Sequence, residues 1–362
     1  MKASQTISTE LRLLFTFRKN SRKWHLALLA AICVGTPLLL GIYFNNLQQA
    51  LLASLSALVI LYLPGSGSKT HRILTLLICS FGFMVSFSFG LIFSFHPLVA
   101  IFSFGIFSFL AHWVALYYKA SPPRSFFFIM VASMAICMPF DLSSIPIKIG
   151  MVSLGTIFSC ILGLIYIFLF PSTQTNKSES EAANKDFRKY ADYWEAIITG
   201  CFMCVALALG HLMKLDNPYW IPISCAAVMQ GASLYHIWQR SFYRITGTFI
   251  GLGLCWFILG IVESPFSIAI TIIILQFIIE ILVVRHYAWA VVFITPLTIL
   301  LSEAAHPLFH NPDELITLRF TEICIGSILG AFGGWTLHKE KLRFHSIKGL
   351  ALIGNKMKKT RS

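Results

Sequence analysis

The chain has 362 residues, of which 12% are charged, 57% are hydrophobic and 14% are aromatic. A soluble chain carries about 25% charged residues, so this composition, with a mean hydropathy of +0.75, excludes water as the main solvent. The net charge of +13 does not indicate nucleic-acid binding, because the basic residues stand in short loops and tails between apolar runs.

Twelve apolar runs follow one another along the chain, each bounded by turn-forming or charged residues. A span of the ~30 Å hydrocarbon core needs about 20 apolar residues, and several of these runs are near the short end, which also fits re-entrant segments. We expect an all-α integral membrane protein with about twelve transmembrane helices. The expected helices cover residues 25–43, 47–63, 72–94, 97–118, 125–140, 146–170, 195–213, 218–235, 244–262, 265–284, 287–303 and 316–337.

The first apolar run follows a basic tail and lacks a small-residue cleavage site, so we expect the first helix to be retained. Lys and Arg residues sort onto alternate sides of the helices in a ratio of 25 to 3, with Lys148, Lys214 and Arg319 on the poorer side. Because positive loops stay inside, we expect a multi-pass protein of the bacterial cytoplasmic (inner) membrane with both termini in the cytoplasm.

The two halves of the sequence resemble each other at an offset of about 170 residues. Lys148, Gly155, Ser159 and Gly163 correspond, at a constant offset of 171, to Arg319, Gly326, Gly330 and Gly334. Each half has an even number of expected spans, which predicts two parallel six-helix repeats. The expected segments are a basic tail (1–24), a first repeat (25–171), a linker (172–193), a second repeat (194–338) and a second basic tail (339–362).

Small residues at four-residue spacing form stripes on several expected helices. Gly326 and Gly330 form one pair, and Gly247 and Gly251 another. Such stripes let helices approach closely in lipid, and a smooth glycine face could also border a substrate path. Pro222 and Pro296 fall inside apolar runs, where each either kinks its helix or breaks it beside a water-filled cavity.

Six basic residues at or near helix starts form pairs across the expected repeat. Lys148 and Arg319 start the sixth helix of each half on the predicted outer side, where they either snorkel to the surface or attract an anion. The other four, on the predicted cytoplasmic side, serve as topology signals or as anion-attracting rings. The candidate anion pathway is thus Lys148, Arg319, Arg72, Arg244, Arg124 and Arg285.

A few titratable side chains inside the apolar runs are candidates for proton coupling. Glu322 follows Arg319 by one turn, a spacing that also allows an ion pair. Glu280 stands near the end of its helix, and His112 titrates near neutral pH. Each has a structural alternative, in which the side chain is solvated, paired or packed.

The sequence offers no pattern for an enzyme. All nine cysteines fall inside apolar runs, where free cysteine behaves as a small hydrophobe. The pair Cys201 and Cys204 has no second pair with which to bind a metal. With no metal-ligand cluster, activated nucleophile or phosphate-binding loop in a polar context, we expect no enzyme activity, metal or cofactor.

Several short segments in the second half resemble a known family. Pro218-Tyr-Trp-Ile-Pro-Ile, Val228-Met-Gln230, Trp238-Gln-Arg240, Arg244-Ile-Thr-Gly-Thr248 and Phe293-Ile-Thr-Pro296 resemble the FUSC (fusaric acid resistance protein-like) family, which includes aromatic acid exporters. The resemblance covers about 194–337 and, more faintly, 24–170. It implies an inner-membrane exporter of aromatic or other hydrophobic carboxylic acids, driven by the proton gradient. The sizeable cytoplasmic domain of many members has no counterpart in this sequence.

The leading expectation is therefore an organic-anion exporter whose partners are the lipid bilayer and a small anion, with a periplasmic adaptor or a second copy of the chain also considered. Two alternatives stay open. One is a passive anion channel, since the family is similar in plan to plant malate channels with a basic pore. The other is a membrane scaffold subunit that transports nothing.

Overall fold

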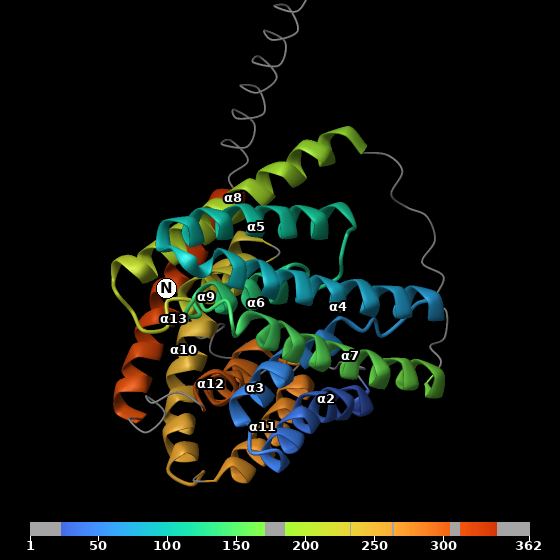
Figure 1. Cartoon of the computed structure of the whole chain (residues 1–362). Coiled ribbons are helices and arrows are strands. Elements are labelled where there is room, and N and C mark those ends of the chain that lie inside the picture. The colour runs from blue at the N-terminus through green and yellow to red at the C-terminus, as the bar shows by residue number, and fades with distance from the viewer. Residues whose placement is uncertain (1–22, 171–184, 232, 263, 305–311, 339–362) are drawn as a thin grey trace, which may run out of the picture.

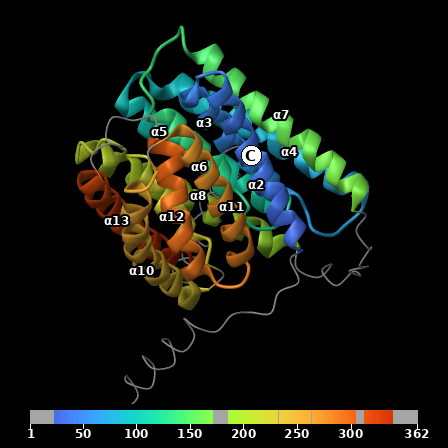
Figure 2. The ribbon, with the colours of Figure 1, turned by 90° about the horizontal axis from the view of Figure 1, so that it is seen from below.

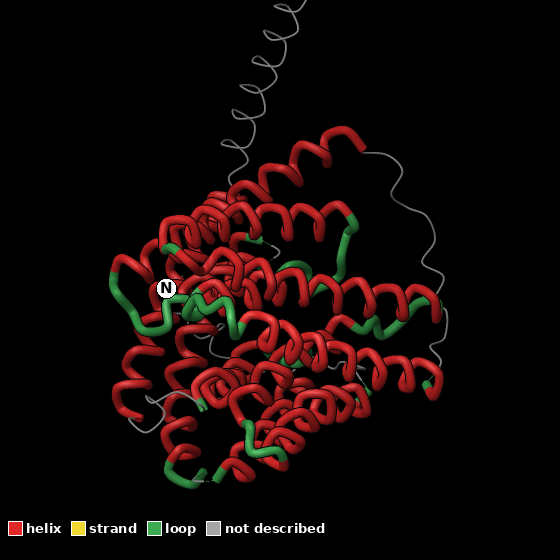
Figure 3. Tube along the Cα trace, in the orientation of Figure 1, coloured by secondary structure: helices red, strands yellow, loops and turns green. Residues whose placement is uncertain are grey.

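The computed structural model describes residues 23–170, 185–231, 233–262, 264–304 and 312–338, and this part of the chain contains helices and no strand (Figures 1 and 3). The all-α class is therefore confirmed for it. Both expected basic tails, apart from Lys23 and Trp24, and residues 172–184 of the expected linker lie outside the described residues.

The described helices form two series of six on either side of the linker. The first contains α2 (Trp24–Tyr43), α3 (Leu47–Ser56) continued by the 3₁₀ helix η1 (Ala57–Tyr62), α4 (Lys69–Ile92) with η2 (Phe93–Phe95), α5 (Pro97–Tyr117), α6 (Phe126–Ile136) and α7 (Ile145–Leu169). The second contains α8 (Lys185–Leu212), α9 (Trp220–Met229), α10 (Leu234–Leu259), α11 (Pro265–Leu282), α12 (Tyr287–Glu303) and α13 (Pro312–His338).

Eight of these helices are long and apolar enough to cross a membrane. The other four, α3 with η1, α6, α9 and α12, are apolar but have only 10–17 residues. At 1.5 Å per residue, the ten-residue α9 extends roughly 15 Å, about half of a bilayer core. Length and hydropathy thus support eight spans among the described residues, and the expected count of twelve stays a prediction.

The helix boundaries follow from local chemistry. Ser264 caps α11 through a reciprocal bond with Ser267, and Pro265 occupies the first turn, where its missing N–H has no partner to lose. The short α6 lies between Pro123 and Pro139, which cannot continue a helix. Pro222 lies in the first turn of α9 and α12 continues through Pro296, so neither proline ends its helix.

The third helix of the second half begins ten residues earlier than its apolar run. Ser233 caps α10, accepting a hydrogen bond from the His236 N–H at 3.3 Å, and the helix starts at Leu234 rather than near residue 244. The expectation that Arg244 opens this helix is therefore wrong. The residue lies in the third turn, and only 7% of it is exposed.

Neighbour relations among the helices correspond between the halves. In the first half α4 packs on α6 and α7, and α7 on α3; in the second half α10 packs on α12 and α13, and α13 on α9. The halves meet along two seams, α5 against α8 and α2 against α11, at opposite edges of the bundle in Figure 1. Figure 2 shows α2 and α7 on one side and α10 and α13 on the other.

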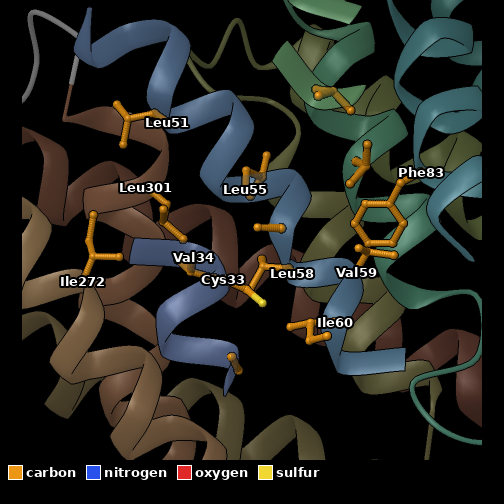
Figure 4. Packing of buried hydrophobic residues seen from close by; sticks show 14 of the residues in the cluster. Cys33, Val34, Leu51, Leu55, Leu58, Val59, Ile60, Phe83, Ile272 and Leu301 are labelled. Carbon is orange, nitrogen blue, oxygen red and sulfur yellow. The ribbon is translucent and has the colours of Figure 1, made fainter. Parts of the chain in front are cut away.

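The halves share the largest hydrophobic cluster. The largest buried cluster combines Cys33 and Leu58 of the first half with Ile272 and Leu301 of the second (Figure 4). Because these side chains pack together rather than in separate clusters, the two series form one packed unit rather than two independent domains.

The glycine stripes lie where a long helix crosses a short one. A Cβ at Gly330 would stand 2.7 Å from the carbonyl oxygen of Cys225 in α9, and one at Gly326 would clash with that of Ile221. Gly155 lies equally close to Ala53 of α3, and Gly251 to Val292 of α12. Only residues without a side chain allow these backbones to approach so closely.

Candidate functional site

A cavity of about 210 Å³ lies at the centre of the bundle, between the two halves. All four short helices contribute to its lining, together with α10 and α11. Its volume is below the ~300–1,000 Å³ of typical ligand pockets, which favours a small solute. Central cavities between half-length helices are typical binding sites in helical transporters, so this cavity is the candidate site.

The second half supplies the polar wall of the cavity. Arg244 on α10 donates from Nη2 to the Ser224 hydroxyl at 3.2 Å, and its Nε atom has no hydrogen-bond partner among the described residues. Arg240, one turn earlier, places its guanidinium 4.4 Å from the centre of the Tyr287 ring. A buried guanidinium group (Arg244) and a half-buried one (Arg240) that face one cavity form a site for an anion, because a buried cation is costly without a negative partner.

A carboxylate completes this wall. Gln276 and Glu280, four residues apart on α11, are both almost fully buried and line the cavity. The Gln276 amide donates to Glu280 Oε1 at 3.5 Å, and its own oxygen has no partner in the described part of the chain. The wall thus combines two cations with one titratable acid.

The first half supplies an apolar wall. Its contribution comes from α3, η1, α6 and the turn before α6, and consists of Leu55, Leu58, Leu61, Pro123, Phe126, Phe127, Met130 and Met134. None of these side chains can donate a hydrogen bond to a solute. A cavity with one cationic wall and one aromatic and aliphatic wall matches the two ends of a hydrophobic carboxylate.

Arg319 lies behind the cavity rather than at its entrance. Only 2% of it is exposed, and its guanidinium stacks on the Trp220 ring at 3.7 Å. It also donates from Nη2 to Ser302 at 2.8 Å and lies 3.8 Å from the Glu322 carboxylate. Trp220 and Ser302 line the cavity, so Arg319 and Glu322 form a buried pair that supports its wall.

The remaining predicted cations lie away from the central cavity. Arg72 donates to the carbonyl oxygens of Pro64 at 3.0 Å and Phe170 at 3.2 Å, which fastens the ends of neighbouring helices. Lys148 is half-buried near the start of α7 and does not line the cavity. The structure therefore does not bring Lys148 and Arg319 together as a matched pair.

Arg124 and His112 line a second, more polar cavity of about 500 Å³ beside the α5–α8 seam. His112 Nε2 lies 3.4 Å from Glu195 Oε1, and Arg124 lies 3.6 Å from the same oxygen. Phe126 and Gln230 belong to the lining of both this cavity and the central one. They form the boundary between the two spaces.

Arg285 lines a third, small pocket of about 60 Å³ at the α2–α11 seam, together with Lys23 and Glu280. Glu280 also lines the central cavity. This carboxylate is therefore the boundary between the central cavity and the end of the bundle at which α2 begins.

Sequence reasoning missed Arg240, Gln276 and Tyr287. A signal for the first two was present: Arg240 and Arg244, and Gln276 and Glu280, are each four residues apart, which places each pair on one helix face. Among the described residues, no group of three or more His, Cys, Asp or Glu side chains is placed to share a metal ion.

Comparison with known proteins finds a family match in the part of the chain that contributes the polar wall of the cavity. Residues 204–333 match a family model described as fusaric acid resistance protein-like. This part of the chain is similar in sequence to that family. The resemblance predicted from Pro218–Pro222 and Phe293–Pro296 is confirmed, and this FUSC segment contains Arg240, Arg244, Gln276 and Glu280.

A curated relative of the chain comes from Bacillus subtilis (strain 168). Over 135 residues the two chains are 35% identical, and the relative carries the description "uncharacterized membrane protein YvaC". The alignment covers 37% of this chain and 21% of the relative, so the chain spans about a fifth of the length of the relative it matches. No solved structure shows significant similarity to the chain.

Proposed function

We propose that the chain is a transporter, rather than an enzyme, that exports organic anions, in particular aromatic or other hydrophobic carboxylic acids, across the bacterial inner membrane. The observation that carries the proposal is the central cavity, where Arg240 and Arg244 face an apolar wall. The FUSC match and eight membrane-length helices support the same function.

The substrate would lie with its carboxylate toward α10 and its ring toward α6. A guanidinium binds a carboxylate through two parallel hydrogen bonds, and Arg244 has an Nε atom without a partner among the described residues. Phe126, Phe127 and Met130 offer the apolar contact. Binding one end by charge and the other by packing selects for amphipathic acids over inorganic anions.

We further propose that the twelve helices are two parallel six-helix repeats related by an axis along the membrane normal. Corresponding residues with corresponding neighbours support this arrangement. Ser159 donates to the Ala57 carbonyl at 3.1 Å, and at the matching position a Cβ on Gly330 would stand 2.7 Å from the Cys225 carbonyl. The cavity would then lie at the interface of the repeats, with α3 and α6 facing α9 and α12.

Orientation belongs to the same proposal. The 25 to 3 distribution of Lys and Arg supports a cytoplasmic location for both termini. The starts of α2, α4, α6, α10 and α12 would then face the cytoplasm. The second, polar cavity, near the start of α6, would lie on the same side.

Transport by the purified full-length chain in proteoliposomes tests the proposal. Radiolabelled benzoate is loaded inside and its efflux is followed, for the wild type and for Arg244→Gln and Arg240→Gln. A charge-assisted hydrogen bond contributes about 1.5–3 kcal/mol, so we expect each variant to lower kcat/KM roughly tenfold to a hundredfold. Lys69→Gln, an exposed lysine at the start of α4 outside the cavity, should change it less than twofold.

Two other functions predict different results in the same vesicles. A passive anion channel would give benzoate flux that follows voltage and the anion gradient at any pH difference, whereas an exporter coupled to protons responds to that difference. A scaffold subunit would give no flux above empty liposomes. Wild-type efflux that equals the empty-vesicle leak would therefore refute the proposed function.

A further inference from the structure

We propose that Glu280 is a protonation switch for the anion site: the ionised carboxylate competes with the substrate for Arg240 and Arg244, and the protonated carboxyl leaves them free. The inference rests on the proposed function, because it assigns a regulator to the same cavity. It also separates Glu280 from Glu322 and His112, the two other candidates for proton chemistry.

The first argument is position. Glu280 is 3% exposed and lines the same cavity of about 210 Å³ as the two arginines. In so small and apolar a space, charges interact more strongly than in water. An anionic solute and an ionised Glu280 would both be attracted to the same guanidinium groups and would repel each other, so the site favours one negative charge at a time.

The second argument is access. Glu280 also lines the small pocket that contains Lys23 and Arg285, at the end of the bundle where α2 begins. The predicted orientation makes this the cytoplasmic end. Protons from that side can therefore reach the carboxyl without passing through the bound substrate.

Charged and titratable groups around Glu280 come from several elements. The start of α2 contributes Lys23, the turn before α12 and α12 itself contribute Arg285 and Tyr287, and α10 contributes Arg240 and Arg244 across the cavity. His286 instead packs against the Tyr243 ring, with centroids 5.6 Å apart. Among the described residues that line these two cavities, Glu280 is the one carboxylate beside several cations, and its charge state changes how much positive charge is left for a solute.

The other two candidates lack this arrangement. Glu322 is fully buried 3.8 Å from Arg319 and does not line the cavity. His112 lies beside the α5–α8 seam, hydrogen-bonded to Ser125 at 2.7 Å and 3.4 Å from Glu195. Neither group faces the two cavity arginines.

The effect of protonation on anion affinity has a definite direction. Protonation of Glu280 increases affinity for the anion, and by reciprocity anion binding increases the affinity of Glu280 for a proton. Weak acids that enter a cell acidify its cytoplasm, so their own entry would activate the site that exports them. The device thus regulates export by cytoplasmic pH.

Equilibrium binding to the full-length protein in nanodiscs tests the switch. Benzoate and benzenesulfonate are titrated between pH 5.5 and 8, the sulfonate because its charge does not change in this range. The wild type should bind both probes at least about fivefold more tightly at the acid end, the lower limit of typical coupling between two sites. Glu280→Gln should bind equally at every pH, with the affinity that the wild type reaches at pH 5.5.

Two variants keep the test decisive if Glu280→Gln folds poorly. Arg285→Gln removes an exposed cation beside Glu280, which eases protonation and should shift the midpoint of the wild-type profile to higher pH. Glu314→Gln, which changes an exposed carboxylate at the start of α13 outside the cavity, should leave the midpoint unchanged.

The outcomes separate the two proposals. A wild type that binds neither probe at any pH refutes the proposed function. A wild type that binds both with a flat pH profile overturns the switch alone. So does a folded Glu280→Gln protein that keeps the wild-type profile or binds neither probe, because a neutral glutamine should imitate the protonated acid.

Discussion

The first and second halves of the chain pack alike but present different chemistry to the cavity between them. In both, a long last helix crosses a short second helix through a closely packed glycine. Gly155 of α7 packs against α3, and Gly326 of α13 packs against α9. Yet the cavity wall of the first half is apolar, whereas that of the second carries Arg240, Arg244 and Glu280. The family match falls in the second half, which holds the polar residues.

The contrast between similar packing and different cavity walls shows that packing and substrate binding place separate requirements on the sequence. Packing requires small residues at fixed intervals, and a structure built from two similar series needs them twice. Substrate chemistry requires only one charged wall, since a small anion has one carboxylate. An apolar opposite wall then completes the site for the rest of the molecule. Equal packing and unequal chemistry lead to predictions that can be checked independently.

The largest expected effect tests the packing. Gly155→Leu and Gly326→Leu should each prevent folding, because the added side chain would overlap the backbone of α3 or α9. Gly150→Leu and Gly253→Leu are matched controls on α7 and α10, with no atom near the added Cβ, and should fold. Yield and size-exclusion profiles in detergent measure this. Tolerance of only one of the two central substitutions would show that the halves do not pack alike.

The next effect concerns a cation that the halves do not share. Arg319→Gln removes the cation that lies 3.8 Å from the buried Glu322 carboxylate, and breaking a buried pair costs about 3–5 kcal/mol. We expect a strongly lowered thermal unfolding midpoint. The double variant Arg319→Met with Glu322→Gln removes both charges and should recover much of that loss. A double variant as unstable as Arg319→Gln would argue against the ion pair as the cause.

A smaller effect tests the apolar wall. Met130→Ala enlarges the cavity on the α6 side, and a change of this size in a hydrophobic pocket alters discrimination by about 1–3 kcal/mol per methylene. The preference for naphthoate over benzoate should rise several-fold in the efflux assay. Met151→Ala on α7, outside the cavity, is the control. An unchanged ratio of naphthoate to benzoate efflux in Met130→Ala would show that the substrate ring does not bind beside Met130.

The sequence predicts the helical class and the order of the segments, because burial in lipid leaves a clear apolar signal for each helix. It does not predict how far each helix extends. The α10 helix begins at Leu234, ten residues before its apolar run, because Ser233 caps an amphipathic turn that includes Arg240. Hydropathy identifies a helix only where its residues are apolar. A turn with polar side chains that face an internal cavity is therefore mistaken for a loop.

The candidate site is predictable only in part for the same reason. Arg244 and Glu280 stand out as charges inside apolar runs, and both line the cavity. Arg72 stands out equally, but the structure uses it to hold the Pro64 and Phe170 carbonyls. Sequence shows which charges stand within or beside apolar runs. It does not show whether a backbone oxygen or a cavity lies beside them, since that depends on contacts between distant helices.

The smallest expected effect compares two positions that correspond in sequence. Lys148 and Arg319 stand 171 residues apart at the same place in the repeat, but Lys148 is half-buried away from the cavity, whereas Arg319 stacks on Trp220 at its wall. Lys148→Gln should therefore change benzoate efflux less than twofold and stability by no more than ~0.5 kcal/mol. A tenfold loss of efflux in a stable Lys148→Gln protein would restore the matched pair as part of the pathway, and both halves would then contribute charge to transport.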